Sequence, residues 1–407
     1  MQQLCLVQIN CSHNGSTGTI MNSIHAAAVQ SGWRSYTICV GTKQARAAAL
    51  ANQIYIRHAI ERGFYRKFNK LTGRYGLGFP LATRELLAVL DRLKPDLLQL
   101  HNLHHHFFDI GSLFTYIKKH DIRVVWTLHD CWPFTGLCTH FQISGCKKWQ
   151  IGCYKCPSLR GYPTIYLDQT KKLYSLKKKW FCSVPHMQLV ATSEWMAGLV
   201  KQSFLKDYSV SVLHHGIDHS VFRPTSSALA YENDWTGKFV VLGVAFIWSY
   251  AKGIDVYASL AEHLDESYQI VLVGEIPEGY QLPPNVCCLG KIADKRKIAE
   301  LFSAADVFFN PTREEALGLV NVESLACQTP VVTFRTGGTA ECVDETCGVL
   351  LDDCRWEAAY EVIRRMRNGE LRFSSEACTK KSMEFTEQNQ QQTYLEIYRR
   401  MTEPDQE

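Results

Sequence analysis

"DVFFNPTREEALGLVNVESLACQTPVVTF" occupies residues 306–334 and alternates an apolar run, a polar loop, a stretch of small and apolar residues, and a second apolar run. This order predicts a strand, a loop, a helix that begins near Gly318, and another strand. Glu315 lies in the predicted loop, and Glu323 lies in the early turns of the predicted helix. Strand–helix–strand units of this kind build parallel sheets, so we expect an α/β fold.

The same alternation extends along almost the whole chain. Apolar or β-branched runs are separated by amphipathic stretches, which indicates parallel sheets covered by helices on both faces. The strands expected in the first half are residues 3–10, 34–41, 96–102, 123–130 and 187–193. Those expected in the second half are residues 239–245, 268–274, 285–290, 306–311 and 329–334.

The length of the chain predicts two domains, because 407 residues are too many for one ordinary core. The strand series restarts after VLHHGIDHSVFRPTSS (212–227), whose glycine, proline and serines suit a linker. We predict two doubly wound, Rossmann-like domains facing across a cleft, at residues 1–220 and 221–385. The helical stretch 386–403 could pack back on the first domain. In such folds ligands bind beyond the carboxyl ends of the strands.

Composition restricts the classes of function. The chain is 46% hydrophobic and 21% charged with a net charge of +4, so composition gives nucleic acid binding no support. The N-terminus, MQQLCLVQIN, has no signal-peptide pattern, and no window reaches the roughly 20 apolar residues of a membrane span. We expect a cytoplasmic protein, whose 16 cysteines would stay reduced.

Glu315 and Glu323 flank the predicted helix start. Free N–H groups at a helix N-terminus favour an anion such as a diphosphate. Two carboxylates beside that anion would accept hydrogen bonds from the hydroxyl groups of a sugar or a ribose. The alternative is an acidic helix start that binds no ligand.

The stretch PTREEALGLVNVESLACQTPVV (311–332), followed by TGGTAE (336–341), resembles the donor-binding signature of retaining GT-B glycosyltransferases of family 4. Five further motifs fall in the order expected for that family: GSTG (15–18), TLHD (127–130), VATSEWM (190–196), GID (216–218) and AKGID (251–255). The cysteine-containing segment 129–157 is similar to a branch that builds bacterial surface polysaccharides, such as colanic acid and O-antigens. The resemblance covers the chain and implies a GT-B fold.

This resemblance implies a donor site in the second domain. Glu315 would contact the hydroxyls of the donor sugar, and Glu323 would contact the ribose. The backbone of Gly318, Leu319 and Val320 would lie against ribose and phosphate. The donor would be a UDP- or GDP-sugar.

The resemblance implies three further roles. Lys252 would neutralise the diphosphate, and His129 would face the reacting sugar, so that His129, Glu315 and Lys252 form the predicted catalytic set. Gly15 and Gly18 would let the first loop approach the phosphates, which a Cβ would obstruct. The alternatives are a solvated lysine, a structural histidine at a strand end and a simple tight turn.

The implied activity is sugar transfer to a growing glycan, which is expected to be linked to a polyprenyl lipid, with retention of configuration. No catalytic metal is expected, because lysine and helix dipoles would stabilise the leaving diphosphate. Without an obvious nucleophile, we expect a front-face mechanism in which that diphosphate helps to deprotonate the acceptor. A catalytically idle GT-B subunit and a nucleotide-sugar epimerase of the same fold are the alternatives.

Two positions depart from the family pattern. Phe246 and Ile247 occupy the region where an arginine usually precedes the lysine, so one cation for the diphosphate is missing. Gln328 stands where a glycine is expected. If the backbone is left-handed there, the glutamine costs about 1 kcal/mol.

Four cysteines follow His129 in a polar segment, at positions 138, 146, 153 and 156. Cys138, Cys146, Cys153 and Cys156 could hold a structural zinc ion, because the closing CxxC and two upstream thiols allow a tetrahedral site. His140 could replace one ligand. Four free thiols are the alternative.

Two stretches mix cations with aromatic residues, ERGFYRKFNK (61–70) and KKLYSLKKKWF (171–181). They could lay the first domain against the anionic lipid of the inner membrane, where a lipid-linked acceptor would be found. The alternative is a pair of solvated helix faces with their aromatic residues turned inward.

Overall fold

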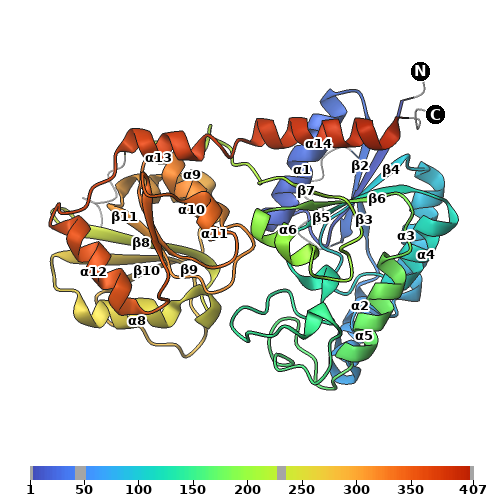
Figure 1. The fold of residues 1–407 in the computed structure, drawn as a ribbon, viewed down its shortest axis with the longest axis horizontal. Helices are drawn as coiled ribbons and strands as arrows, with labels where there is room; N and C mark the ends of the chain where they lie inside the picture. The colour runs from blue at the N-terminus through green and yellow to red at the C-terminus, as the bar shows by residue number, and fades with distance from the viewer. Residues whose placement is uncertain (1–2, 42–51, 227–234, 404–407) are drawn as a thin grey trace. The chain divides into compact units, whose positions relative to one another are not determined.

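The computed structural model describes residues 3–41, 52–226 and 235–403. The chain divides into two units (Figure 1), and each holds one parallel sheet with helices. Unit 1 comprises Met1–Leu213 with Gln390–Glu407, and unit 2 comprises His214–Asn389, where the sequence analysis expected 1–220 and 221–385. The two Rossmann-like domains are therefore present.

The sheet of unit 1 has seven strands in the order β3-β2-β1-β4-β5-β6-β7, all paired in parallel. The strands are β1 (Cys5–Ile9), β2 (Arg34–Val40), β3 (Gln53–Ile56), β4 (Leu97–Leu100), β5 (Arg123–Leu128), β6 (Met187–Ala191) and β7 (Val210–Val212). The helices are α1 (Gly15–Gln30), α2 (Ala59–Thr72), α3 (Pro80–Leu93), α4 (Ile110–Lys119), α5 (Thr170–Phe181), α6 (Glu194–Val200) and α14 (Glu387–Thr402), with short 3-10 turns η2 (Trp132–Phe134) and η3 (Lys148–Gln150). The central strands β1, β4 and β5 are buried almost throughout, as expected for a sheet covered on both faces.

The sheet of unit 2 has six parallel strands in the order β10-β9-β8-β11-β12-β13. The strands are β8 (Phe239–Ile247), β9 (Tyr268–Glu275), β10 (Val286–Gly290), β11 (Val307–Asn310), β12 (Val331–Phe334) and β13 (Gly348–Leu351). The helices are α8 (Ile254–His263), α9 (Lys295–Ala304), α10 (Leu319–Ala326), α11 (Thr339–Cys342), α12 (Trp356–Arg367) and α13 (Ser375–Ser382), with a 3-10 turn η4 (Tyr250–Lys252). Along β11, Phe308 packs into the core on one face while Val307 and Phe309 pack into the core on the other. The two-residue period of a strand thus supplies both cores.

All ten expected strands are present, and the three that were not predicted lie at sheet edges. These are β3, β7 and β13, which are only three or four residues long. An edge strand has one neighbour, so it needs fewer apolar residues and gives a weaker sequence signal. The residues of β3 and β7 are mostly half-buried.

The expected linker, 212–227, starts at the end of β7 in unit 1, and its residues 214–226 belong to unit 2, while Ser227 lies outside the described residues. The N–H of Ile217 donates to the carbonyl of Phe385 at 3.0 Å, and Phe222 is buried in the core of the unit. A Cβ on Gly216 would lie 2.2 Å from the carbonyl carbon of Thr386, so the two chain segments cross in direct backbone contact. Glycine is required at this crossing.

Helix α14 packs on unit 1, as proposed for residues 386–403. Tyr394 Oη lies 2.9 Å from Thr127 Oγ1 of β5, and the ring of Tyr398 meets that of Trp33 edge-on at 5.8 Å. Both tyrosines are fully buried. The C-terminal helix therefore completes the core of the first domain.

Gln328 adopts φ +68°, so the position expected to need glycine is left-handed. The Gln328 amide N–H donates to the carbonyl of Leu325 at 2.9 Å and closes the end of α10. Within the described residues, the helices include none with the length and apolarity of a membrane span.

Candidate active site

In unit 2, the predicted catalytic lysine and glutamate meet at the carboxyl ends of neighbouring strands. Lys252 ends the turn after β8, and Glu315 lies in the loop after β11. Lys252 Nζ and Glu315 Oε2 are 2.7 Å apart, and the side chains are 37% and 23% exposed. A pair this exposed adds little stability. It can therefore open when a charged ligand arrives.

Two glycines hold these loops in place. A Cβ on Gly253 would lie 2.4 Å from the carbonyl oxygen of Pro311, and its φ is +74°, so the loop after β8 packs directly on the loop after β11. Gly318 adopts φ +94° immediately before α10. The helix then begins at Leu319, as the sequence predicted, and Leu319 and Val320 are half-buried in its first turn.

The loop that carries Glu315 is fixed by the TGGTAE segment. The N–H of Gly338 donates to the carbonyl of Glu315 at 3.3 Å, and the N–H of Ala316 donates to Glu315 Oε1 at 3.2 Å. The second carboxylate oxygen is the one that meets Lys252. Both carboxylate oxygens of Glu315 thus have a partner within unit 2.

Glu323 lies in the second turn of α10, and its side chain is half-buried. Burial raises the pKa of Glu323 to about 7, and the positive charge of Lys295 opposes this shift. The carboxyl therefore titrates near neutral pH, unlike an ordinary surface glutamate. Such a group is common at ligand sites.

No arginine takes the expected place before Lys252. Phe246 and Ile247 are 66% and 48% exposed. Lys291 Nζ lies 3.6 Å from the centre of the Phe246 ring. Arg313 is also close in sequence to the acid pair, but both its terminal nitrogens contact Asp255 at 2.8 Å. Its charge is therefore already balanced within unit 2.

In unit 1, His129 follows β5 and pairs with a histidine that the sequence analysis missed. His101, at the end of neighbouring β4, places Nδ1 3.0 Å from His129 Nε2, and the rings stack at 5.3 Å. His101 Nε2 lies 3.2 Å from Gln8 Oε1, which can only accept, so His101 Nε2 carries a proton and its Nδ1 accepts from His129 in the neutral rings. This fixes the tautomer of His129.

A second missed group links the histidines after β4 to the motif after β5. His104 Nε2 contacts Asp130 Oδ2 at 2.8 Å, and both side chains are buried. Burial opposes ionisation of Asp130, but the charge and hydrogen bond of His104 win and lower the pKa of the carboxyl. Parallel neighbours end at the same edge, so "HNLHHH" (101–106), which starts at the end of one predicted strand, and "HD" (129–130), at the end of the next, contained the signal.

Gly15 and Gly18 lie in the first turn of α1. Gly15 adopts φ +79°, and a Cβ there would meet no other atom within 4 Å. A Cβ on Gly18 would lie 2.3 Å from the backbone of His13. The close contact with His13 therefore explains why residue 18 is a glycine without any ligand, while Gly15 leaves open space beside the loop.

The expected zinc site is not formed. Among the described residues, which include all four thiols, no three His, Cys, Asp or Glu side chains gather into a group that could hold a metal ion. The Cys138 thiol is hydrogen-bonded to Cys156, which lowers the pKa of Cys156 to about 7 and raises that of Cys138. Cys153 is buried, and its sulfur accepts the N–H of Gly136 at 3.1 Å. Cys138 and Cys156 thus contact each other, while Cys153 contacts the backbone of Gly136.

Lys177 connects α5 to the residues just before these cysteines. Its side chain is only 3% exposed, and Nζ donates to the carbonyls of Trp132 at 2.7 Å and Thr135 at 3.0 Å. The ammonium also lies 3.4 Å from the centre of a Trp132 ring. Lys177 belongs to the basic stretch 171–181, yet it is a buried contact to residues 132–135 and not part of a solvated helix face.

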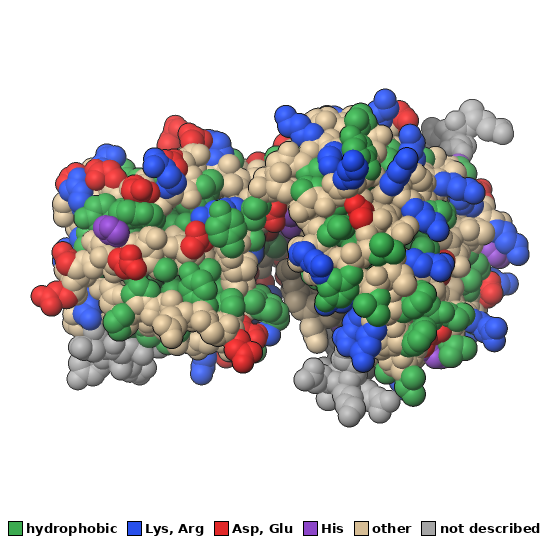
Figure 2. Space-filling view, turned by 90° about the horizontal axis from the view of Figure 1, so that it is seen from below, with side chains coloured by type: hydrophobic (Ala, Val, Ile, Leu, Met, Phe, Trp, Pro, Cys, Tyr) green, Lys and Arg blue, Asp and Glu red, His purple; other side chains and the backbone are tan. Residues whose placement is uncertain are grey.

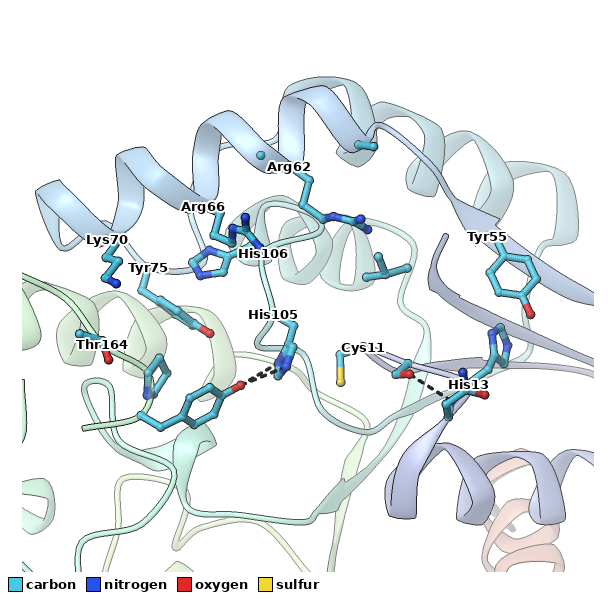
Figure 3. A pocket seen from close by; sticks show the side chains of 17 residues that line it. Cys11, His13, Tyr55, Arg62, Arg66, Lys70, Tyr75, His105, His106 and Thr164 are labelled. Carbon is cyan, nitrogen blue, oxygen red and sulfur yellow. Dashed lines mark hydrogen bonds between the residues drawn. The ribbon is translucent and has the colours of Figure 1, made fainter. Parts of the chain in front are cut away.

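Unit 1 also contains a cavity of about 730 Å³ that none of the predicted site residues lines. Figure 3 shows Arg62, Arg66 and Lys70 extending from α2 toward it, with His105 and Tyr75 across the space. The basic stretch 61–70 thus contributes three of its four cations to a cavity.

Comparisons with known proteins give the chain its relatives. Residues 18–221, half of the chain, match the family described as Glycosyltransferase Family 4, and residues 237–391 match the family described as Glycosyl transferases group 1. A relative in Escherichia coli K12, named provisionally as the colanic acid biosynthesis glycosyl transferase WcaC, is 24% identical over 85% of this chain and 86% of its own length.

Solved structures show the same architecture. The sucrose-phosphate synthase of Thermosynechococcus elongatus superposes with a TM-score of 0.71 at 15% identity, covering 98% of this chain and 99% of that one. Anabaena HepE in complex with UDP superposes with a TM-score of 0.68 at 14% identity and the same coverage of both chains. At these identities the likeness establishes the fold alone.

Proposed function

This chain belongs to Glycosyltransferase Family 4 and is a glycosyltransferase of GT-B fold, and from this premise we propose its reaction. It moves a sugar from a UDP- or GDP-sugar to a growing, lipid-linked glycan with retention of configuration, during assembly of a bacterial surface polysaccharide. The similarity to WcaC over most of both chains supports this type of pathway.

The observation that carries the proposal is the Lys252–Glu315 pair at the start of α10. The lysine and the helix N-terminus can bind a diphosphate, and the carboxylate can accept hydrogen bonds from sugar hydroxyls. A nucleotide sugar presents these two groups next to each other. The pair therefore fits the sugar–diphosphate junction, where the reaction takes place.

In the proposed reaction the acceptor hydroxyl oxygen bonds to the anomeric carbon as the bond from that carbon to the diphosphate oxygen breaks. The acceptor proton passes to the departing phosphate oxygen on the same face, so configuration is retained. Lys252 stabilises the negative charge that develops on the diphosphate. In unit 1, we assign His129 to the donor sugar, and the tautomer of His129 is set by His101.

Incubation with a panel of radiolabelled UDP- and GDP-sugars, without acceptor, tests the function. We expect slow release of free sugar from one donor, since water can replace the acceptor. A second nucleotide sugar as product would identify an epimerase. Nucleotide binding with no product from any donor, even with glycan acceptors, would identify the idle subunit and contradict the proposal.

Nucleotide affinity should rise with pH through about 7 if Glu323 contacts the ribose as a carboxylate, because its pKa is about 7. At one pH unit below its pKa only about a tenth of the group is ionised, so the affinity at pH 6 should be up to about tenfold lower than at pH 8. The same pKa affects folding stability. Because the pKa of Glu323 is higher in the folded chain than in the unfolded one, its contribution to the free energy of unfolding is fully present below pH 4.5 and is lost as pH rises through about 7.

Calorimetric titration with UDP and GDP between pH 6 and 8 measures this effect. Ionisation of the nucleotide phosphates also changes in this range. Glu323→Gln is the matched control, because its pH profile retains the effect of the phosphates and lacks that of the carboxylate. Identical pH profiles for the wild type and Glu323→Gln would refute the assignment.

Helix α2 also supports the proposed membrane contact. Its side chains Ile60, Phe64 and Leu71 are 91%, 62% and 62% exposed, and they lie on one side of the helix. In α5, by contrast, Tyr174 and Phe181 are buried, which is the inward arrangement of the alternative interpretation. Figure 2 shows hydrophobic and Lys or Arg side chains interspersed on the face of unit 1 seen from below. We assign the contact to α2 only.

Phe64→Ser with Ile60→Ser should weaken binding to vesicles that contain phosphatidylglycerol, since two large apolar side chains no longer insert. Sedimentation with the vesicles should show at least a tenfold loss. Ile151→Ser is the control, because Ile151 is 83% exposed but lies outside α2. Equal losses in the control and the α2 variant, or no vesicle binding by the wild type, would rule out this surface.

A further inference from the structure

The cavity of unit 1 is rich in positive charge. Arg62, Arg66 and Lys70 are spaced four residues apart on α2, so they share one face of the helix, and in Figure 3 all three extend toward the cavity. Among the 17 described residues that line it, none is an Asp or Glu. The cavity therefore has three cations and no acid on its walls.

These cations have no acidic partner among the described residues. The one acid of α2, Glu61, is used elsewhere, since its carboxylate accepts the N–H groups of Leu81 and Ala82 at 2.8 and 2.9 Å. Burial lowers the pKa of Arg62, and repulsion from Arg66 lowers it further. Arg66 and Lys70 are exposed, so solvent screens part of the repulsion among the three cations, and an anion bound between them would offset the rest.

The opposite wall offers polar groups of fixed orientation. Tyr162 Oη lies 3.0 Å from His105 Nδ1, and Tyr75 packs edge-on against His106 at 4.4 Å. Burial, the neighbouring histidine and Arg66 lower the pKa of His106 to about 4, and burial with His104 lowers that of His105 to about 4. Both rings are neutral at pH 7 and can donate a hydrogen bond without adding charge.

The backbone of this wall is strained. His105 and His106 adopt φ of +117° and +58°, conformations that non-glycine residues rarely hold. Each such residue costs on the order of 1–3 kcal/mol, so the surrounding structure must hold it in place, and residues of this kind cluster at active sites and ligand sites. Two consecutive residues of this kind line the same cavity.

We propose that this cavity binds the phosphate or diphosphate group of the acceptor, held by Arg62, Arg66 and Lys70; this rests on the proposed function. Guanidinium groups bind phosphate oxygens in a bidentate manner, which favours phosphate over a single hydroxyl. The three positions span about 12 Å along the helix axis, which is long enough for a diphosphate and its attached sugar. The acceptor is thereby recognised by its charged linkage as well as by its glycan.

Calorimetry on the full chain tests the proposal with inorganic pyrophosphate as the probe. Saturating UDP or GDP is present, so that the donor site is filled. We expect one site in the wild type and at least a tenfold loss of affinity in Arg62→Gln/Arg66→Gln. Lys67→Gln removes an exposed cation of the same helix that does not line the cavity, and it should bind as the wild type does.

Farnesyl diphosphate and mannose 1-phosphate distinguish the source of the phosphate. Tighter binding of farnesyl diphosphate than of pyrophosphate identifies a lipid diphosphate, and a preference for mannose 1-phosphate identifies a soluble sugar phosphate; both support the site. Absence of pyrophosphate binding in the nucleotide-saturated wild type, or equal binding by the arginine variant, would overturn it. Donor hydrolysis is measured on the same samples. It reports the proposed function independently of pyrophosphate binding, and hydrolysis by the arginine variant shows that this variant is folded.

Discussion

Lys252→Ala is expected to lower the rate of sugar transfer about 10²–10³-fold, the range found when one preorganised group is removed from a developing anion. The effect should be large because the usual arginine is absent: Phe246 and Ile247 stand in its place, and Arg313 is held by Asp255. UDP or GDP affinity should fall by about tenfold or more, the loss that follows removal of one charge-assisted hydrogen bond.

Glu315→Gln should behave differently, although Glu315 lies 2.7 Å from the same lysine. A contact with the transferred sugar is lost while Lys252 is released to the diphosphate. Turnover should therefore fall strongly with little change in nucleotide affinity. Steady-state kinetics and calorimetry separate the two effects.

Lys380→Ala, an exposed cation of α13, is the control for charge alone and should be unaffected. Near-normal nucleotide affinity in Lys252→Ala would place the diphosphate elsewhere. Equal losses of nucleotide affinity in the Lys252 and Glu315 variants would contradict the separate roles.

The fold could be predicted where burial determines the sequence. Central strands such as β1 and β5 are covered on both faces, so nearly every residue must be apolar, and the pattern is visible in the chain. Edge strands such as β3 and β13 escape this requirement. The positions of Glu315 and Glu323 could be predicted for the same kind of reason, because a strand, a loop and a helix start determine which residues lie at the end of the sheet.

Contacts between distant segments could not be predicted in this way. His101 and His129 come from different strands, and only the sheet order places them 3.0 Å apart. Arg62, Arg66 and Lys70 resemble a solvated helix face until the loop with His105 is seen opposite them. A single sequence gives the residues of such a site but not their pairing.

The four cysteines show the limit most clearly. Their spacing allowed a metal site, but spacing does not determine where the thiols point, and Cys153 turns to the backbone of Gly136. The lysines of 171–181 are typical of a solvated helix face. One of them, Lys177, is nevertheless buried and donates to two carbonyls just before the cysteines.

Lys177→Ala is expected to lower the free energy of unfolding by about 2–4 kcal/mol. The carbonyl of Thr135 loses the ammonium, and that of Trp132 keeps only the N–H of Thr135 at 3.4 Å, while a buried acceptor left unsatisfied costs about 1–3 kcal/mol. Residues 131–160 should loosen and sugar transfer should fall, while unit 2 still binds nucleotide. Urea unfolding, transfer assays and calorimetry with UDP or GDP measure the three effects. Lys178→Ala, an exposed neighbour on α5, is the control.

The pH dependence distinguishes the buried ammonium from mere loss of volume. Burial lowers the pKa of Lys177 well below 10.5, so the unfolded chain binds this proton more tightly than the folded one. Stability attributable to Lys177 should therefore increase as pH rises toward 10.5, because the penalty for burying a charge disappears when the amine is neutral. Lys177→Met keeps most of the volume but has no proton to lose, so its stability relative to the wild type should decline with increasing pH. A constant difference between pH 7 and 10, or wild-type stability in Lys177→Ala, would show that the segment is held by other contacts.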